Sequence, residues 1–271
     1  MMLGQWGHSY PDEVSPPSER EDFADILLRW FDRWLKGDER SSTGPAVEVQ
    51  DADDVWRRES KWPPQGRTAL LRPSPSGGLA ADSRPQQGTV LLAADPFHFQ
   101  DPLAAQGAGI GTGGADLPVD PAQICAQPLC AAFRTAPMQA VYRIAGIPRL
   151  RLTATPLGPG GTVSAFVFAE GGEGLRRIAW GQVDLRFPRG DDVSRSVEPG
   201  TPIALDFTLQ PFDAPVRKGE RLTLVLSMGN TYNRLPATAP GPVILELGDR
   251  TTGLRLTAVS PARSQFFRPP R

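Results

Sequence analysis

The chain has 271 residues, which is long enough for one large all-β domain or for two ordinary domains with a substantial buried core. Its 29 lysines and arginines nearly balance its 30 aspartates and glutamates, so the net charge of -1 supplies no basic field for a nucleic-acid backbone. The N-terminus lacks the basic segment and apolar run of a secretory signal, and no stretch is long enough to cross a bilayer. These features predict a soluble chain, cytoplasmic as it stands, without nucleic-acid or membrane partners, whose full-length parent could still be secreted.

The first element in chain order is an amphipathic helix predicted over residues 18–37. Ser18 and Glu21 have the spacing of a capping box, and Gly37 lies where helices commonly end. Large apolar residues recur between them with the helical period and form one continuous stripe, namely Phe23, Ile26, Leu27, Trp30, Phe31, Trp34 and Leu35. An uncovered stripe of this kind would be a sticky patch. We therefore expect it to fold back onto the sandwich or to be covered by another chain, a second copy in a homo-oligomer included.

The pattern changes from the helical period to a period of two beyond about residue 45. Ile203, Leu205, Phe207 and Leu209 alternate strictly with more polar residues, as in a half-buried strand. Similar patterns predict further strands at Ala46–Gln50, Thr68–Arg72, Thr89–Ala93, Leu150–Thr155, Thr162–Ala169, Arg177–Phe187, Arg221–Met228, Val243–Leu247 and Leu254–Val259. Because no helical segments separate these strands, the sequence predicts a mainly β fold, a jelly-roll β-sandwich of the galactose-binding-like kind.

The remaining stretches are predicted to be loops or a tail. Pro73–Gly88 is rich in Pro, Ser and Gly, and Asp95–Gln123 holds the densest glycine cluster. We place the domain boundaries so that residues 1–40 form the helical N-terminal part, residues 41–262 the jelly roll and residues 263–271 a flexible tail.

The candidate ligand motifs are too weak to predict a metal or a cofactor. Cys125 and Cys130 offer two ligands where a structural zinc site needs four. They form either a local disulfide in an oxidising compartment or two free thiols in a cytosolic protein. Residues 109–114 match G-x-G-x-x-G but lack the strand before and the helix after that a dinucleotide site requires.

The order of several short motifs carries a family resemblance. Gly4-Gln5-Trp6-Gly7-His8 is followed by the helix that ends in Trp30-Phe31-Asp32-Arg33-Trp34-Leu35-Lys36-Gly37. Later pieces are Val55-Trp56-Arg57, Lys61-Trp62-Pro63, Trp180-Gly181 and Gly219-Glu220-Arg221-Leu222. Together they resemble the C-terminal region of the X-Pro dipeptidyl-peptidase and cocaine-esterase-like (CocE/NonD) serine hydrolases. The resemblance implies that the N-terminal 40 residues are the end of an α/β-hydrolase domain.

His8 is the candidate catalytic residue, because the resemblance implies that it is the general base of a Ser-His-acid triad. In α/β-hydrolases the triad residues follow the chain order serine, acid, histidine, and no G-x-S-x-G elbow occurs in these residues. The chain would then be the C-terminal portion of an ester or amide hydrolase that is inactive alone. Its partner would be the missing hydrolase domain, or a companion chain, carrying the serine and the aspartate.

A second hypothesis is a stand-alone jelly-roll module that binds a carbohydrate or a protein. Trp56, Trp62 and Trp180 could form an aromatic platform for such a ligand. Buried core or interface tryptophans explain the same residues.

Overall fold

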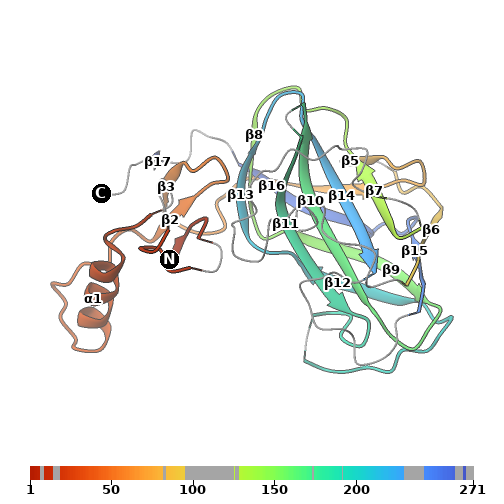
Figure 1. Ribbon diagram of the computed structural model, residues 1–271, viewed down its shortest axis with the longest axis horizontal. Helices are drawn as coiled ribbons and strands as arrows, with labels where there is room; N and C mark the ends of the chain where they lie inside the picture. The colour runs from red at the N-terminus through yellow and green to blue at the C-terminus, as the bar shows by residue number, and fades with distance from the viewer. Residues whose placement is uncertain are drawn as a thin grey trace.

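The computed structural model describes residues 1–6, 9–14, 19–81, 84–94, 125, 128–172, 174–190, 192–228, 241–259 and 265–266. A large β-sandwich occupies one side of the molecule, and a smaller unit of short strands and one helix lies on the other (Figure 1). His8, Ser18, the predicted loop over 95–123 and its 109–114 motif lie outside the described residues.

Two antiparallel sheets make the sandwich. In the described residues the first has four strands in the order β11-β10-β14-β7, with bounds Gly174–Asp184, Thr162–Gly171, Arg221–Met228 and Cys130–Arg134. The second follows the order β13-β8-β16-β9-β15-β6, with bounds Phe212–Val216, Tyr142–Gly146, Gly253–Val259, Arg149–Pro156, Val243–Glu246 and Thr89–Leu92. Off this path, β12 (Ile203–Thr208) pairs with β9, β4 (Arg67–Pro73) with β16, and β5 (Leu79–Ala81) with β4.

The main core lies between these two sheets. Leu205 and Phe207 of β12 are buried and Ala204 and Thr208 are exposed, which confirms the predicted alternation. Each of the ten strands predicted from the sequence is present with its ends shifted by a few residues at most. The prediction of a mainly β sandwich is therefore confirmed.

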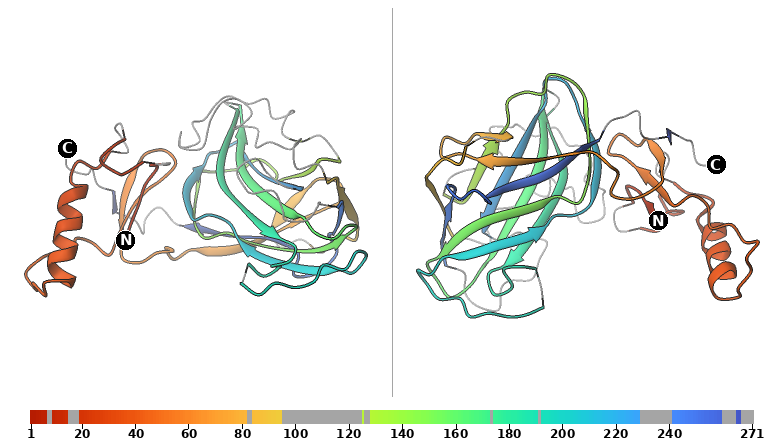
Figure 2. Two further views of the ribbon diagram at one scale, coloured as in Figure 1. Left: turned by 60° about the horizontal axis from the view of Figure 1, so that its bottom comes forward. Right: turned by 180° about the vertical axis from the view of Figure 1, so that it is seen from behind.

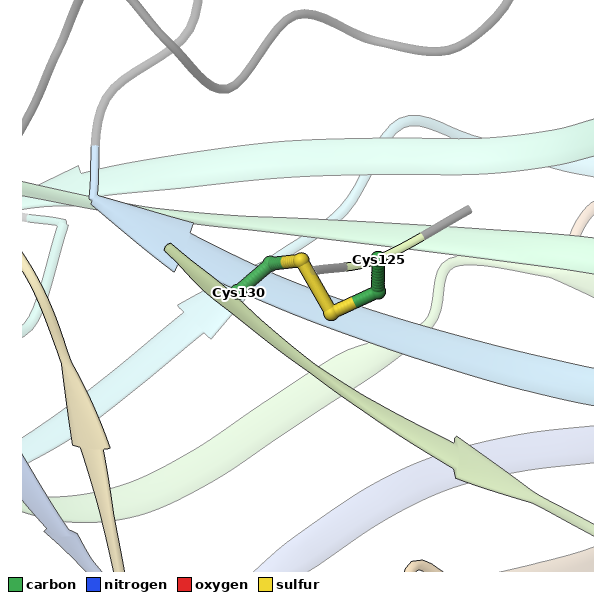
Figure 3. Close-up of a disulfide and its surroundings, with 2 residues drawn as sticks. All are labelled: Cys125 and Cys130. Carbon is green, nitrogen blue, oxygen red and sulfur yellow. A yellow bond between two sulfur atoms is a disulfide. The ribbon is translucent and has the colours of Figure 1, made fainter. Parts of the chain in front are cut away.

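Strand β10 is buried on both faces. Val163 and Val167 belong to the main core, whereas Phe166 and Phe168 form a second apolar cluster with Val225. Strands that are covered on both sides lose the apolar and polar alternation. Cys130 lies in this second cluster and forms a disulfide with Cys125, with the two Cα atoms 5.6 Å apart (Figure 3). The structure thus selects the disulfide from the two states that the sequence left open.

The smaller unit is a mixed sheet. In the described residues its strand order is β1-β2-β3-β17, with bounds Met2–Leu3, Val47–Gln50, Trp56–Glu59 and Gln265–Phe266. Strand β1 pairs in parallel with β2, and the helix α1 (Phe23–Trp34) lies between them in the chain. A strand, a helix and an adjacent parallel strand form a βαβ unit. The strand pattern did not predict this unit, because β1 is too short to show a period.

The expected tail and one expected loop also contain strands. Strand β17 pairs with β3 within the predicted tail over 263–271, and the flexibility of that tail stays a prediction. Strand β5 lies within the predicted loop over 73–88, where Ser74 and Gly78 close a hairpin by a backbone hydrogen bond of 2.8 Å from the Ser74 N–H to the Gly78 carbonyl. The turn residues dominate the composition there, but Leu79 is buried and anchors the short strand. The predicted domain boundaries stay a prediction.

The helix begins later than its sequence pattern indicates. It starts at Phe23, and the Asp22 side chain makes no capping hydrogen bond, so the predicted start at Ser18 is wrong. Arg20 explains the difference, because its buried guanidinium binds Asp22 at 2.8 Å and Glu48 of β2 at 2.8 Å. This pair ties the residues before Phe23 to the sheet and occupies the carboxylate that could have capped the helix. The predicted end holds, since Gly37 has a φ of 73° and follows the last turn.

Candidate functional site at the N-terminal segment

The described part of the N-terminal segment is held along β2. The Met1 amino group donates to the Ala46 carbonyl at 2.7 Å, and Met2 and Leu3 pair with Glu48 and Val49. In open α/β sheets, ligands and catalytic loops lie beyond the carboxyl ends of parallel strands. The segment Gly4–Trp6 leaves β1 at that end. His8 follows this segment in the sequence, and its role as general base stays a prediction.

Gln50 continues the contact past the end of β1. The Gln5 N–H donates to the Gln50 Oε1 atom at 3.0 Å, and the Gln5 side-chain amide donates to the Gln50 carbonyl at 3.5 Å. The Gln50 amide group in turn donates to Asp54 at 3.1 Å. The direction of the chain after β1 is therefore set by polar contacts to β2 and its following turn.

Trp6 also anchors this segment to the small sheet. Its ring lies 6.1 Å from the ring of Trp56 in β3, and the Arg20 guanidinium lies 4.9 Å from the Trp56 ring centre. Burial opposes the charge on Arg20, but hydrogen bonds and the charges of Asp22 and Glu48 outweigh it and raise the pKa of Arg20. The arginine is thus a permanent cation over the Trp56 ring. Sequence reasoning missed Arg20, because it fell within the predicted helix.

The aromatic platform of the second hypothesis is not assembled. Trp56 is buried in the small sheet, and Trp180 packs against the second apolar cluster of the sandwich. Trp62 is half-buried after the end of β3. A stand-alone binding module on this platform stays a prediction without support from these positions.

The apolar stripe of α1 faces solvent. No residue of the helix is buried, and Trp30, Trp34 and Leu35 are 47%, 63% and 74% exposed. The helix lies at the end of the small unit that is remote from the sandwich (Figure 2). The expectation that the stripe folds back onto the sandwich is therefore wrong, and coverage by another chain or domain stays a prediction. The reason is geometric, because the β1–β2 pairing holds the helix at the small sheet.

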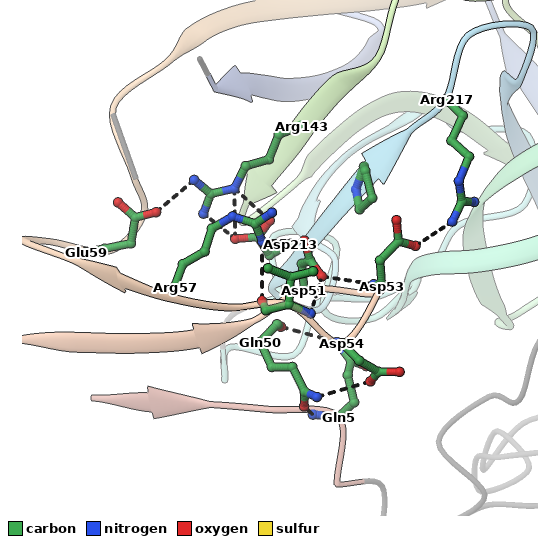
Figure 4. A network of polar contacts seen from close by, with 12 residues as sticks. Gln5, Gln50, Asp51, Asp53, Asp54, Arg57, Glu59, Arg143, Asp213 and Arg217 are labelled. Atoms are coloured by element: carbon green, nitrogen blue, oxygen red, sulfur yellow. Dashed lines mark hydrogen bonds and ion pairs between the residues drawn. The ribbon is translucent and has the colours of Figure 1, made fainter. Parts of the chain in front are cut away.

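Buried charges connect the small sheet to the sandwich. Arg143 of β8 binds Asp213 of β13 through its Nε atom at 2.9 Å and Glu59 of β3 through its Nη1 atom at 2.7 Å (Figure 4). Burial opposes the charge on Arg143, but hydrogen bonds and the charges of Asp213 and Glu59 raise its pKa.

Among the described residues, no group of three or more His, Cys, Asp or Glu could hold a metal ion. No helix in the same part of the chain is long and apolar enough to span a membrane.

The fold therefore defines the class of the protein as an antiparallel β-sandwich domain joined to a small mixed sheet that contains a βαβ unit. The comparisons then specify the family. Residues 41–263 match the family described as the X-Pro dipeptidyl-peptidase C-terminal non-catalytic domain. The chain therefore belongs to this family.

Two curated relatives share this similarity in sequence. The chain is 27% identical over 228 residues to the "Putative Xaa-Pro dipeptidyl-peptidase" of Streptomyces avermitilis, a match that covers 77% of the chain and 30% of the relative. It is 23% identical over 235 residues to the protein of the same name from Bacillus anthracis, covering 86% of the chain and 36% of the relative. The chain thus spans about a third of the length of the curated relatives it matches.

Solved structures show the same fold at low identity. An aminopeptidase from a marine sediment thaumarchaeote matches with a TM-score of 0.71 and 16% identity, over 96% of this chain and 49% of that one. An α-amino acid ester hydrolase matches with a TM-score of 0.63 and 16% identity, over 100% of this chain and 50% of that one. A CocE/NonD family hydrolase from Staphylococcus aureus matches with a TM-score of 0.61 and 11% identity, over 88% of this chain and 46% of that one.

Proposed function

We propose that the chain is the C-terminal portion of a serine hydrolase of the X-Pro dipeptidyl-peptidase or cocaine-esterase type, and that it is inactive alone. It contributes His8 as general base to ester or amide hydrolysis by acyl transfer. The observation that carries the proposal is the parallel pairing of β1 with β2 across α1. This unit belongs to an α/β sheet, and the segment before His8 leaves β1 at the end where such sheets place their sites.

The proposed reaction requires a nucleophilic serine and an acid, and the motif that carries the serine in this family does not occur in this chain. The imidazole takes a proton from a serine hydroxyl and returns it to the leaving group, while an acid on its other nitrogen fixes the tautomer. The serine of this enzyme class lies on a G-x-S-x-G elbow, which is missing from these residues. The serine and the aspartate must therefore come from a hydrolase domain or a companion chain.

Two open surfaces of the small unit support such a partner. Strand β1 is the terminal strand of the sheet formed by the described residues, and parallel strands occur in sheets that helices cover on both faces. Trp30 and Trp34 of α1 offer a second, apolar surface on the same unit. The proposed partner extends the sheet at β1 and covers the exposed face of α1.

Hydrolysis of a p-nitrophenyl ester and of an X-Pro-nitroanilide tests the proposal. We expect no turnover by the purified chain, and turnover after the chain is mixed with the polypeptide encoded immediately upstream of Met1. The variant His8→Gln should abolish the restored turnover, whereas the control His98→Gln should retain it. Turnover by the chain alone that disappears in His8→Ala, or restored turnover that survives His8→Gln, would overturn the proposal.

A further inference from the structure

We propose that the ion pair between Arg143 and Glu59 fixes the orientation of the small sheet on the β-sandwich. Arg143 is a positioning residue of the sandwich, and the element that it positions is the sheet on which the N-terminal segment Met1–Trp6 lies. The sandwich would then determine the direction of the segment Met1–Trp6. This role differs from that of a domain that only covers a neighbouring surface.

The Arg143 guanidinium pairs with two different carboxylates. The Nε atom binds both carboxylate oxygens of Asp213, at 2.9 and 3.2 Å, within the pair of neighbouring strands β8 and β13. The Nη1 atom forms an ion pair with Glu59 of β3 at 2.7 Å, without the alignment of a hydrogen bond. Both carboxylates are therefore paired with one rigid, planar cation, so a shift of Glu59 relative to Asp213 would weaken its ion pair with Arg143.

Burial makes this contact sensitive to displacement. The side chains of Arg143, Asp213 and Glu59 are 4%, 0% and 6% exposed. Water does not readily replace a carboxylate partner at such a site, so a rotation of the small sheet would leave a buried charge unpaired. An apolar contact tolerates sliding, whereas a buried ion pair specifies one arrangement, as polar groups do in registering coiled coils.

The turn between β2 and β3 provides two further contacts to the sandwich. The Ala52 N–H donates to the Asp213 carbonyl at 2.9 Å, and Asp53 binds Arg217 at 2.8 Å. Asp51 stiffens this turn, because its Oδ1 atom accepts from the N–H groups of Asp53 at 3.0 Å and Val55 at 2.9 Å. Contacts at the turn and at Glu59 lie at different points of the small sheet, and together they resist rotation about any one of them.

Gln50 links this junction to the N-terminal segment. It directly precedes the stiffened turn and holds Gln5 through the two hydrogen bonds described above. The consequence for catalysis rests on the proposed function, because only a hydrolase would use the direction of this segment. The orientation itself is a property of this chain and is testable without activity.

Pulsed electron-electron spin resonance distances test the proposal on the full chain. Spin labels at Ser42→Cys in the small unit and Thr201→Cys in the sandwich report their separation, since both positions are exposed and the native cysteines are paired. We expect one narrow distance distribution for the otherwise wild-type chain. In Glu59→Gln the distribution should be at least twofold wider, because the ion pair with Arg143 is lost and only the contacts at the turn between β2 and β3 still hold the small sheet to the sandwich. The matched control Glu246→Gln, in β15 of the sandwich, should leave the distribution unchanged.

A second variant separates orientation from folding. Glu59→Met removes the charge and keeps the volume of the side chain, while Arg143 stays neutralised by Asp213. Circular dichroism should show both Glu59 variants folded at the temperature of the distance measurement. Distributions as narrow as that of the unsubstituted chain in both variants would overturn the proposal, whatever the outcome of the hydrolysis assay.

Discussion

Trp6 and Trp56 pack with their ring centres 6.1 Å apart, although one belongs to the N-terminal segment and the other to the strand β3. The contact joins the segment before His8 to residues that match the non-catalytic domain family. The histidine-bearing end of the proposed hydrolase and its β-rich domain therefore share one packed unit, and damage to that unit should affect both.

Trp56→Ala should destabilise the protein by about 3–5 kcal/mol, because it removes a buried aromatic side chain together with its contacts to Trp6 and Arg20. Urea unfolding followed by circular dichroism measures the loss. The control Trp62→Ala removes a half-buried ring and should cost less. Equal losses in the two variants would contradict the assigned role of Trp56.

Trp30→Asp should reduce self-association of the isolated chain and change its unfolding free energy by no more than about 0.5 kcal/mol, because Trp30 is exposed on α1. Light scattering at increasing protein concentration measures the first effect. Arg29→Ala, an exposed change away from the stripe, serves as control. If the unsubstituted chain and Trp30→Asp were equally monomeric at every concentration, the stripe would not act as a contact surface between copies.

Breaking the disulfide between Cys125 and Cys130 should cost about 2 kcal/mol, the chain entropy expected for so short a closed loop. Urea unfolding with and without dithiothreitol measures the cost. The double variant Cys125→Ala/Cys130→Ala should show no further effect of the reductant. Rapid reaction of two thiols with Ellman's reagent in the untreated, unfolded chain would show that the disulfide is not formed.

The stability of the sandwich should decrease in acid partly through Asp206. Burial raises the pKa of the Asp206 carboxyl, but hydrogen bonds from Arg149 and Arg151 and their charges outweigh it and hold that pKa below its usual value. A carboxyl with a lowered pKa in the folded state stabilises the fold above its unfolded pKa of about 3.9. This stabilisation is lost as the pH falls through the folded pKa.

The variant Asp206→Asn should therefore lower the thermal midpoint at neutral pH and flatten its decline below about pH 4. Thermal unfolding between about pH 2 and pH 7 measures both effects. The double variant Arg149→Met/Arg151→Met should flatten the same region, because it removes the groups that lower the pKa. An acid decline as steep as in the unsubstituted chain would show that Asp206 does not contribute.

The sequence alone was sufficient to predict a structural feature where the neighbours of a residue along the chain determine its environment. Ile203 to Leu209 alternate because a strand turns successive side chains to opposite faces, and the stripe through Trp30 and Trp34 follows the helical period. The family resemblance likewise rests on motifs that stay in order along the chain, and the matched family confirms it. Within the candidate site, the sequence identified Trp6 and Trp56 as members of family motifs but gave no sign that they touch.

Only the tertiary structure decided which distant segments meet. The parallel pairing of Leu3 with Val49, the delayed start of α1 beside Arg20, and the pairing of Phe266 with Arg57 each depend on contacts between residues far apart in the chain. The same is true of Arg143. Its sequence neighbours do not distinguish it from other strand arginines, and only the fold brings Asp213 and Glu59 next to it. Local periodicity encodes which face of an element is apolar, whereas pairing and burial of charge depend on through-space distances that no local pattern contains.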